Sequence, residues 1–257
     1  MELNSIKDQL YYSTVMIESA QSSGTAFFVS KTFGELGRIY LVTNRHVVEN
    51  KTKCSIRFHM SESLDPRNKI GDFVHHFTDD DWVNGWKFHN EDEVDLAVFN
   101  LTDTMAYLYD QKQYFFYRSL PIDIIATKDQ TKEVIAMEKV FFVGYPHALR
   151  DNTNNLPIAR SGYLATPLYT DFDGKESFLF DASVFEGSSG SPICIVNENF
   201  EAYTDTAGNV KTNGRFILVG INARTYTFTT DNEKQYLDIG YAWKSYKILE
   251  ILEQNEI

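Results

Sequence analysis

One short segment, residues 187–192 (GSSGSP), constrains this chain more than any other, because of two motifs that precede it. A histidine, His46, follows the strand-like run at residues 39–43 within the sequence TNRHVV. An aspartate, Asp95, immediately precedes the apolar run LAVF at residues 96–99. The chain therefore carries His46, Asp95 and Ser189 in that order, and each lies beside a predicted buried strand.

Ser189 has the surroundings that a nucleophilic hydroxyl needs. A serine is a weak nucleophile, and it requires an adjacent base and backbone N–H donors aimed at the oxyanion that forms during attack. Gly187 can adopt the positive φ that turns its N–H inward, so Gly187 and Ser189 are the predicted donors of an oxyanion hole. Pro192 then begins a strand, where its missing N–H costs least. Taken alone, the segment is equally consistent with an ordinary glycine- and serine-rich turn.

His46 and Asp95 have contexts that suit a general base and the group that orients it. The end of a core strand holds a histidine rigidly enough to reach a serine hydroxyl. A carboxylate that enters an apolar strand needs a partner, and an imidazole N–H would supply one. Taken separately, His46 is also explained as a satisfied histidine at a strand end, and Asp95 as part of the acidic stretch at residues 91–93. The joint occurrence of all three residues in this order favours a catalytic role.

The order His46, Asp95, Ser189 is that of chymotrypsin-like serine peptidases, and the chain resembles the trypsin-like peptidases of the HtrA and glutamyl-endopeptidase type. The resemblance implies a serine endopeptidase that hydrolyses peptide bonds through an acyl-enzyme intermediate. The matching blocks follow the family's order and cover most of the chain in pieces: residues 22–30 (SSGTAFFVS), 41–48 (LVTNRHVV), 142–146 (FVGYP), 161–164 (SGYL), 181–192 (DASVFEGSSGSP), 219–222 (VGIN) and 239–242 (IGYA).

The resemblance also implies an all-β fold of two six-stranded antiparallel β-barrels with a C-terminal helix. Residues 1–120 would form the N-terminal barrel that carries His46 and Asp95, and residues 121–257 the C-terminal barrel that carries Ser189. No PDZ-like domain is expected after the C-terminal helix.

The apolar and turn patterns agree with this arrangement. They predict a short helix within residues 1–12, strands at 14–18, 26–30, 39–43 and 56–59, a polar loop at 62–70, an exposed acidic stretch at 78–93, an inter-barrel connection at 107–127, second-barrel strands from about Lys139, a long hairpin at 202–213 and an N-capped amphipathic helix at 245–254.

The resemblance places a substrate pocket among Ser183, Glu186, Asn222, Ala223, Arg224, Tyr241 and Ala242. Its predicted base, Ser183, carries no charge to pair with lysine or arginine, so we expect small or medium uncharged side chains to be preferred. Glutamyl-endopeptidases carry a histidine where this chain has Asn222, so glutamate specificity is not implied. Arg224 follows the strand at 219–222 that would form one wall of the pocket, and its positive charge leaves acidic substrates as an alternative.

Charge, cysteine content and the N-terminal sequence limit the expected binding partners, cellular location and cofactors of this protein. A net charge of −12 argues against binding to nucleic acid or to an anionic membrane surface. Cys54 and Cys194 fall in different predicted barrels and are expected to be free, buried thiols. The first ten residues lack a signal-peptide pattern, so a cytoplasmic location is expected. His75, His76, Asp79, Asp80, Asp81 and His89 show no zinc-ligand spacing, and neither a metal nor another cofactor is expected.

Three functions remain open: an active endopeptidase acting on protein or peptide substrates, a catalytically silent binding or scaffold protein on a peptidase fold, and an esterase-like acyl hydrolase.

Chymotrypsin-like zymogens are activated when a new α-amino group pairs with a carboxylate just before the nucleophile. Here that position is the uncharged Ser188, so we expect no N-terminal processing. Control is expected from ordering of the loops around Gly187 and Ser189, through substrate, a regulatory partner or self-assembly.

Overall fold

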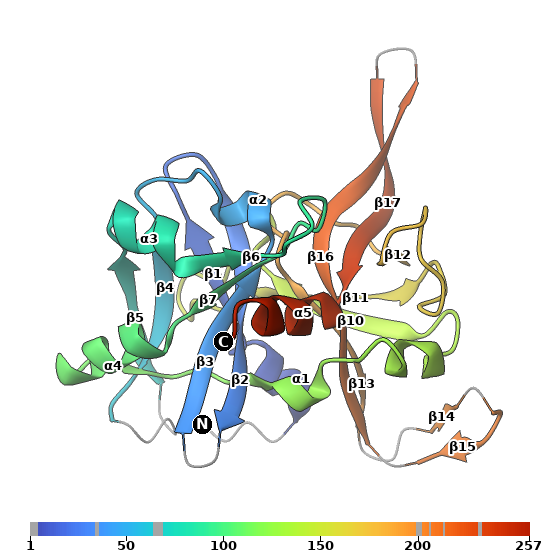
Figure 1. Ribbon diagram of the computed structural model, residues 1–257, viewed down its shortest axis with the longest axis horizontal. Helices are drawn as coiled ribbons and strands as arrows, with labels where there is room; N and C mark the ends of the chain where they lie inside the picture. Colours follow the sequence, from blue (N-terminus) through green and yellow to red (C-terminus); the bar gives the residue numbers. More distant parts are fainter. Residues whose placement is uncertain are drawn as a thin grey trace.

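The apolar runs of the chain become the strands of two antiparallel sheets that lie side by side (Figure 1). This computed structural model describes residues 5–33, 36–63, 69–198, 202–205, 207–212, 214–230 and 233–257. One buried cluster joins the two halves, since it contains Phe27 and Tyr40 from the first sheet together with Cys194 and Leu218 from the second. The two sheets therefore share a core.

The first sheet has nine strands in the order β5-β4-β1-β2-β3-β7-β6, with β8 paired to β4 and β9 running parallel to β2. The expectation of a closed six-stranded barrel in this half is wrong, because the described strands leave the sheet open between β5 and β6. The bounds are β1 Thr14–Glu18, β2 Ser23–Phe33, β3 Leu36–Thr43, β4 Ser55–Ser61, β5 Lys69–His76, β6 Trp86–Phe88, β7 Ala97–Asn100, β8 Tyr114–Phe115 and β9 Leu120–Pro121.

The helix α3 (Asp79–Gly85) joins β5 to β6 and explains the open edge. Trp82 of this helix is only 1% exposed, packs edge-on against Phe77 and Trp86, and donates from Nε1 to the carbonyl oxygen of Val48 at 3.1 Å. Aromatic side chains thus cover the core where strand pairing is missing. The acidic stretch 78–93 is therefore not simply an exposed loop: its acidic residues begin a helix whose other face is buried.

The second sheet closes into a six-stranded barrel in the order β10-β11-β12-β17-β16-β13, as expected for this half. Its first strand starts at Lys139, where the sequence predicted it. The bounds are β10 Lys139–Gly144, β11 Ile158–Leu164, β12 Ser177–Asp181, β13 Pro192–Asn197, β16 Arg215–Thr230 and β17 Glu233–Lys244. Phe142, Phe178, Phe180 and Ile193 fill its interior.

The strands β16 and β17 continue past the barrel as a two-stranded ribbon that projects beyond the rest of the molecule (Figure 1). The shorter hairpin of β14 (Tyr203–Thr204) and β15 (Val210–Lys211) confirms the excursion predicted at 202–213, of which residues 206 and 213 lie outside the described residues. The predicted loop at 62–70 also falls largely outside them, and β5 begins at Lys69.

Four further helices accompany the sheets: α1 Ile6–Leu10, α2 Arg45–Val48, α4 Thr102–Asp110 and α5 Tyr246–Gln254. Helices α1 and α5 confirm the two predicted from periodicity, whereas α4 begins before the connection expected at 107–127. Single-turn 3₁₀ helices occupy Ile122–Ile124, Gln130–Glu133 and Pro146–Ala148. Ser245 precedes α5, but its hydroxyl donates to the carbonyl oxygen of Leu218 at 2.7 Å and makes no capping bond to the helix.

Both cysteines are free and buried, as expected. Burial raises the pKa of Cys54 to about 11 and that of Cys194 further still, which disfavours the reactive thiolate at either residue. No group of three potential metal ligands occurs within the described part of the chain. No helix among the described residues is long and apolar enough to cross a membrane.

Candidate active site

His46 lies in the short helix α2, directly after β3 ends at Thr43. Its Nδ1 is 2.7 Å from Oδ2 of Asp95, and its backbone N–H donates to Oδ1 of the same carboxylate at 2.9 Å. The side-chain amide of Asn44 donates to the backbone oxygen of Asp95 at 2.8 Å. Asp95 is therefore held through both its side chain and its backbone. It fixes the imidazole tautomer with the proton on Nδ1 and leaves Nε2 free to act as a base.

A buried histidine anchors the loop that leads to Asp95. His89 is 3% exposed, and its Nδ1 accepts a hydrogen bond from the backbone N–H of Glu91 at 3.0 Å. Its Nε2, which must then carry the proton, lies 2.9 Å from Oε2 of Glu250 in α5. The C-terminal helix thus holds the Asp95 loop in place, and His89 has a structural partner.

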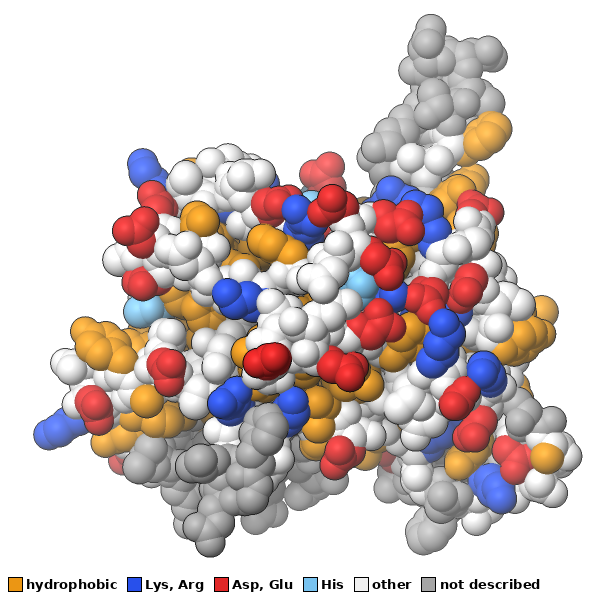
Figure 2. All heavy atoms as spheres, in the orientation of Figure 1, with side chains coloured by type: hydrophobic (Ala, Val, Ile, Leu, Met, Phe, Trp, Pro, Cys, Tyr) orange, Lys and Arg blue, Asp and Glu red, His pale blue; other side chains and the backbone are white. Residues whose placement is uncertain are grey.

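The lysine at the start of α5 extends this network into the second barrel. Lys247 is nearly buried and pairs with both Glu250 and Glu176. Burial by itself raises the pKa of Glu176, but hydrogen bonds from Lys128 and Lys247 outweigh it and hold the pKa at about 2. Figure 2 shows the result as interspersed acidic and basic side chains over the face where α5 meets the base of β16 and β17.

The loop that carries Ser189 is fixed by hydrogen bonds to four successive carbonyl oxygens. The oxygen of Glu186 accepts from the N–H of His147 at 2.6 Å, and that of Gly187 from the hydroxyl of Thr25 at 2.9 Å. The oxygen of Ser188 accepts from the amide of Asn222 at 2.8 Å. The oxygen of Ser189 accepts from the N–H of Thr25 at 2.9 Å. The first sheet and the second barrel together determine the conformation of this loop.

These anchors orient the predicted oxyanion donors. The Glu186–Gly187 peptide is trans, so its N–H points away from the carbonyl that His147 engages. Among the described residues, neither the Gly187 N–H nor the Ser189 N–H has an acceptor. Gly187 has a φ of +85°, and a Cβ at this position would lie 2.4 Å from the oxygen of Tyr145. Only glycine fits this position without strain.

The hydroxyl of Ser189 is not directed at His46. Among the described residues its hydrogen bond is to the carbonyl oxygen of Ala223, at 2.9 Å. Ala223 lies at an irregularity of β16, between Asn222 and Arg224, where the register to β17 shifts. The nucleophile and the base therefore face the same cleft without being hydrogen-bonded to each other.

That cleft has a volume of about 860 Å³. His46, Asp95 and Ser189 line it, and so do Glu186, Ala223 and Arg224 from the predicted substrate pocket. The guanidinium of Arg224 lies 4.6 Å from the ring centre of Tyr241. The cleft continues along β16 past Thr225 and Thr227, which also line it.

The remaining predicted pocket residues do not line the cleft. Asn222 is fully buried beneath the Ser189 loop, where it holds the Ser188 carbonyl. Tyr241 and Ala242 of β17 face the apolar cores. Ser183 is half-buried in the loop before the nucleophile. Tyr241 and Ala242 are consecutive in β17, so their side chains point to opposite faces of the strand and pack into different apolar clusters.

Three residues at the site were not singled out in the sequence: Thr25, His147 and Ala148. Thr25 donates to the Gly187 oxygen and accepts from the N–H of Tyr145 at 3.0 Å, so one hydroxyl links β2, β10 and the nucleophile loop. His147 and Ala148 have φ values of +49° and +57°, an uncommon conformation for residues with a Cβ. Thr25 lies inside the block at 22–30, but its role depends on the folded contacts.

Comparison with known proteins agrees with this architecture. Residues 24–200 match the family model of the trypsin-like peptidase domain. A crystal structure of Rv3671c from M. tuberculosis H37Rv, a serine-to-alanine mutant in an inactive form, superposes with a TM-score of 0.51 at 15% sequence identity. It covers 98% of this chain and 90% of that one. The Rv3671c protease in an inactive form gives a TM-score of 0.47 at 16% identity, covering 95% and 89%.

No curated protein sequence matches the chain significantly. The structural match at 15% identity shows the overall fold alone. The family match spans most of the chain, from β2 to the end of β13, and includes His46, Asp95 and Ser189. The chain belongs to the family of trypsin-like peptidase domains.

Proposed function

We propose that this protein is a serine endopeptidase in which Ser189 is the nucleophile, His46 the general base and Asp95 the group that orients His46. One observation carries the proposal: the doubly hydrogen-bonded His46–Asp95 pair faces the same cleft as Ser189. Ser189 itself lies on a loop in which the N–H groups of Gly187 and Ser189 have no acceptor among the described residues.

The proposed reaction uses these atoms in turn. The Ser189 hydroxyl leaves the Ala223 carbonyl, transfers its proton to Nε2 of His46 and attacks the substrate carbonyl. Asp95 stabilises the imidazolium that forms, and the N–H groups of Gly187 and Ser189 stabilise the oxyanion. His46 then protonates the departing amine, leaving an acyl-enzyme on Ser189. Water activated by His46 hydrolyses this ester and restores the enzyme.

The proposed substrate is a polypeptide that lies along β16. Four residues of β16 line the cleft: Ala223, Arg224, Thr225 and Thr227. Among the described residues, β13 pairs with β16 only as far as Ile221, so the edge of β16 beyond that point is open to an added strand. We expect small or medium uncharged side chains at the residue whose carbonyl is attacked, and a cleavage profile over a peptide library tests this. A profile dominated by lysine or arginine would be contrary to it.

A second candidate is a catalytically silent protein on the same fold. The hydrogen bond from Ser189 to Ala223, in place of one to His46, favours this candidate. A serine-reactive fluorophosphonate separates the two. We expect it to label the protein, and we expect Ser189→Ala to abolish the label and His46→Ala to lower its rate by about three orders of magnitude or more. Absence of labelling, or equal labelling of Ser189→Ala, would support the silent protein.

A further inference from the structure

A second hollow opens beside the catalytic cleft, with a volume of about 540 Å³. It shares His147 and Phe185 with the cleft, so the two hollows adjoin at these residues. Arg150 and Arg160 line it, and no carboxylate occurs among its described lining residues. The charged groups among these lining residues are therefore all basic, although the chain carries a net charge of −12. We call it the arginine pocket and define it by Arg150, Arg160, His147, Leu149 and Phe185.

The two arginines differ from Arg45, Arg57 and Arg215 because they form no ion pair among the described residues. Arg45, Arg57 and Arg215 each form an ion pair at 3.2 Å or less. Within the described part of the chain, neither Arg150 nor Arg160 lies within 4.0 Å of a carboxylate.

Their surroundings are apolar instead. Among the described residues, the guanidinium of Arg150 donates a hydrogen bond to the sulfur of Met16 at 3.6 Å. Arg160 stacks over Phe185 at 5.0 Å and over Phe142 at 5.8 Å. Burial lowers the pKa of Arg160, although Asp238 opposes the effect. A guanidinium desolvated in this way, without a paired anion, can bind a carboxylate through two parallel hydrogen bonds.

The walls of the pocket also carry exposed apolar side chains. Leu149 is 57% exposed and Phe185 43% exposed, and both line the hollow. A ligand that matches the pocket therefore carries a carboxylate next to an apolar side chain. The left-handed backbone at His147 and Ala148 places this wall against the Glu186 carbonyl, immediately beside the nucleophile loop.

We propose that the arginine pocket is a subsite that binds an acidic side chain of the polypeptide substrate, next to an apolar one. The proposal rests on the endopeptidase function above and names the substrate class of that same site. A polypeptide held across Ser189 reaches the pocket because the two hollows meet at His147 and Phe185. We therefore assign the carboxylate that this pocket would bind to the polypeptide substrate and not to a separate small molecule. Recognition here is distinct from the pocket for the residue whose carbonyl is attacked.

Binding to the Ser189→Ala protein tests the proposal without requiring hydrolysis. Fluorescent heptapeptides carry glutamate or glutamine at each position in turn, with leucine beside it, and their dissociation constants are measured by anisotropy. We expect glutamate to bind about tenfold to a hundredfold more tightly than glutamine at one position, as a charged hydrogen bond allows. Arg160→Gln should bring this ratio close to one, Arg160→Lys should retain part of it, and Arg150→Gln should lower it.

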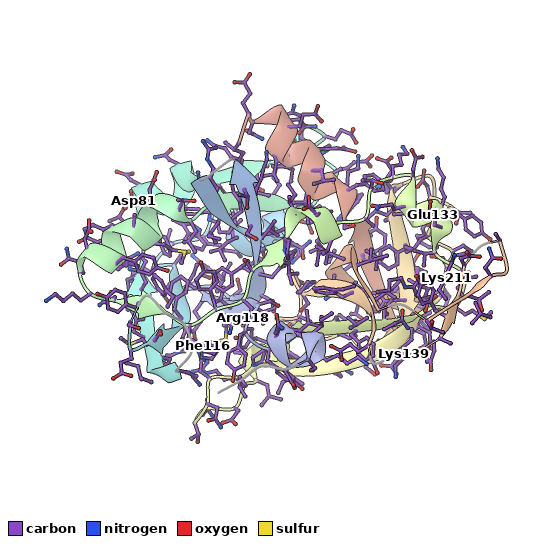
Figure 3. All side chains as sticks on the ribbon, turned by 90° about the horizontal axis from the view of Figure 1, so that it is seen from below. Asp81, Phe116, Arg118, Glu133, Lys139 and Lys211 are labelled. Carbon is purple, nitrogen blue, oxygen red and sulfur yellow. The ribbon has the colours of Figure 1, made fainter. Side chains whose placement is uncertain are left out.

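Arg118 provides a matched control. Its guanidinium stacks over Phe116 at 5.3 Å (both are labelled in Figure 3), much as Arg160 stacks over Phe185. Arg118 lines neither hollow. Arg118→Gln should leave the glutamate-to-glutamine ratio unchanged. Thermal unfolding of each variant shows whether the fold is retained. If Arg160→Gln fails to fold, the glutamate-to-glutamine ratio is compared between the unsubstituted arginine and Arg160→Lys instead.

Two results would overturn the subsite. One is equal binding of glutamate and glutamine peptides at every position, or a ratio that survives in the Arg150→Gln, Arg160→Gln double variant. The other is measured in the protein with Ser189 intact: if an acidic peptide does not slow labelling by an active-site phosphonate, the pocket is a regulatory site and not a substrate subsite. Failure of the endopeptidase function appears separately, as absence of fluorophosphonate labelling in the protein with Ser189 intact.

Discussion

The hydroxyl of Ser189 donates to the carbonyl oxygen of Ala223 at 2.9 Å, on the strand that lines the substrate cleft. A peptide that adds to β16 as a strand has an N–H that competes for this same carbonyl. Occupation of the Ala223 oxygen by substrate would release the Ser189 hydroxyl to rotate toward His46. In this arrangement, substrate binding and activation of the nucleophile are coupled through one acceptor.

This coupling predicts that, even when both inhibitors are saturating, a peptidyl phosphonate labels Ser189 faster than a simple phosphonate does. N-methylation of the amide next to the phosphorus removes the competing N–H. We expect the rate at saturating inhibitor to fall about tenfold, the value of one hydrogen bond. Stopped-time labelling over a range of inhibitor concentrations separates this rate from affinity. An unchanged saturating rate would contradict the coupling.

Thr25 is expected to be needed for both the fold and the reactivity of Ser189. Its hydroxyl is buried and serves both the Gly187 oxygen and the Tyr145 N–H. Thr25→Val leaves both groups without a partner, so we expect a loss of about 2 kcal/mol or more in unfolding free energy. Thr25→Ser keeps the hydroxyl and should lose less. Urea unfolding and phosphonate labelling of the two variants measure the difference, and equal behaviour of valine and serine would argue against the role.

Gly187→Ala should impair oxyanion stabilisation more than it impairs folding. The new Cβ would lie 2.4 Å from the Tyr145 oxygen at a φ of +85°, which displaces the donor peptide. Loss of one oxyanion donor lowers catalysis about 100- to 1000-fold. Gly174→Ala is the matched control, because Gly174 has a φ of +72° with nothing within 4 Å of the new Cβ. If both variants lose labelling equally, the effect is not specific to the oxyanion site.

His59 is expected to make stability depend on pH. It is 4% exposed, and neither ring nitrogen has a hydrogen-bond partner among the described residues. Burial and the charge of Lys69 lower its pKa to about 4, against the opposing effect of Asp72.

Between pH 6.5 and 4 the unfolded chain therefore binds more protons at this residue than the folded protein does. Stability falls as the pH falls through that window, by up to about 3 kcal/mol. His59→Leu should flatten this part of the urea-unfolding profile. A profile of the same slope in His59→Leu would contradict the assignment.

Activity is expected without a new amino terminus. Ser188, immediately before the nucleophile, is buried and carries no charge to receive an ammonium group. The anchors from Thr25, Asn222 and His147 already fix the nucleophile loop in the chain that begins at Met1. We therefore expect the protein beginning at Met1, with an N-terminal tag, to react with the phosphonate as fast as forms truncated before Ser22. Labelling only of a truncated form with a free amino terminus would show that processing is required.

Local sequence determined much of what positions the candidate site. The apolar run at 14–18 became β1 with the same bounds, β10 begins at Lys139, and β3 ends three residues before His46. Gly187 has the positive φ that its place before Ser189 suggested. These features depend on residues within one strand or turn, where side-chain alternation and the conformational freedom of glycine act directly.

Tertiary structure decided the rest, because it depends on contacts between residues far apart in the chain. The open first sheet is accompanied by the packing of Trp82 in α3 against Trp86, and the role of Asn222 follows from its reach to the Ser188 carbonyl. Arg150 and Arg160 look like ordinary surface cations in the sequence. Only the fold shows that they share a hollow without carboxylates among its described residues. A side chain's neighbours across two sheets determine its burial and charge partners, and no local pattern encodes them.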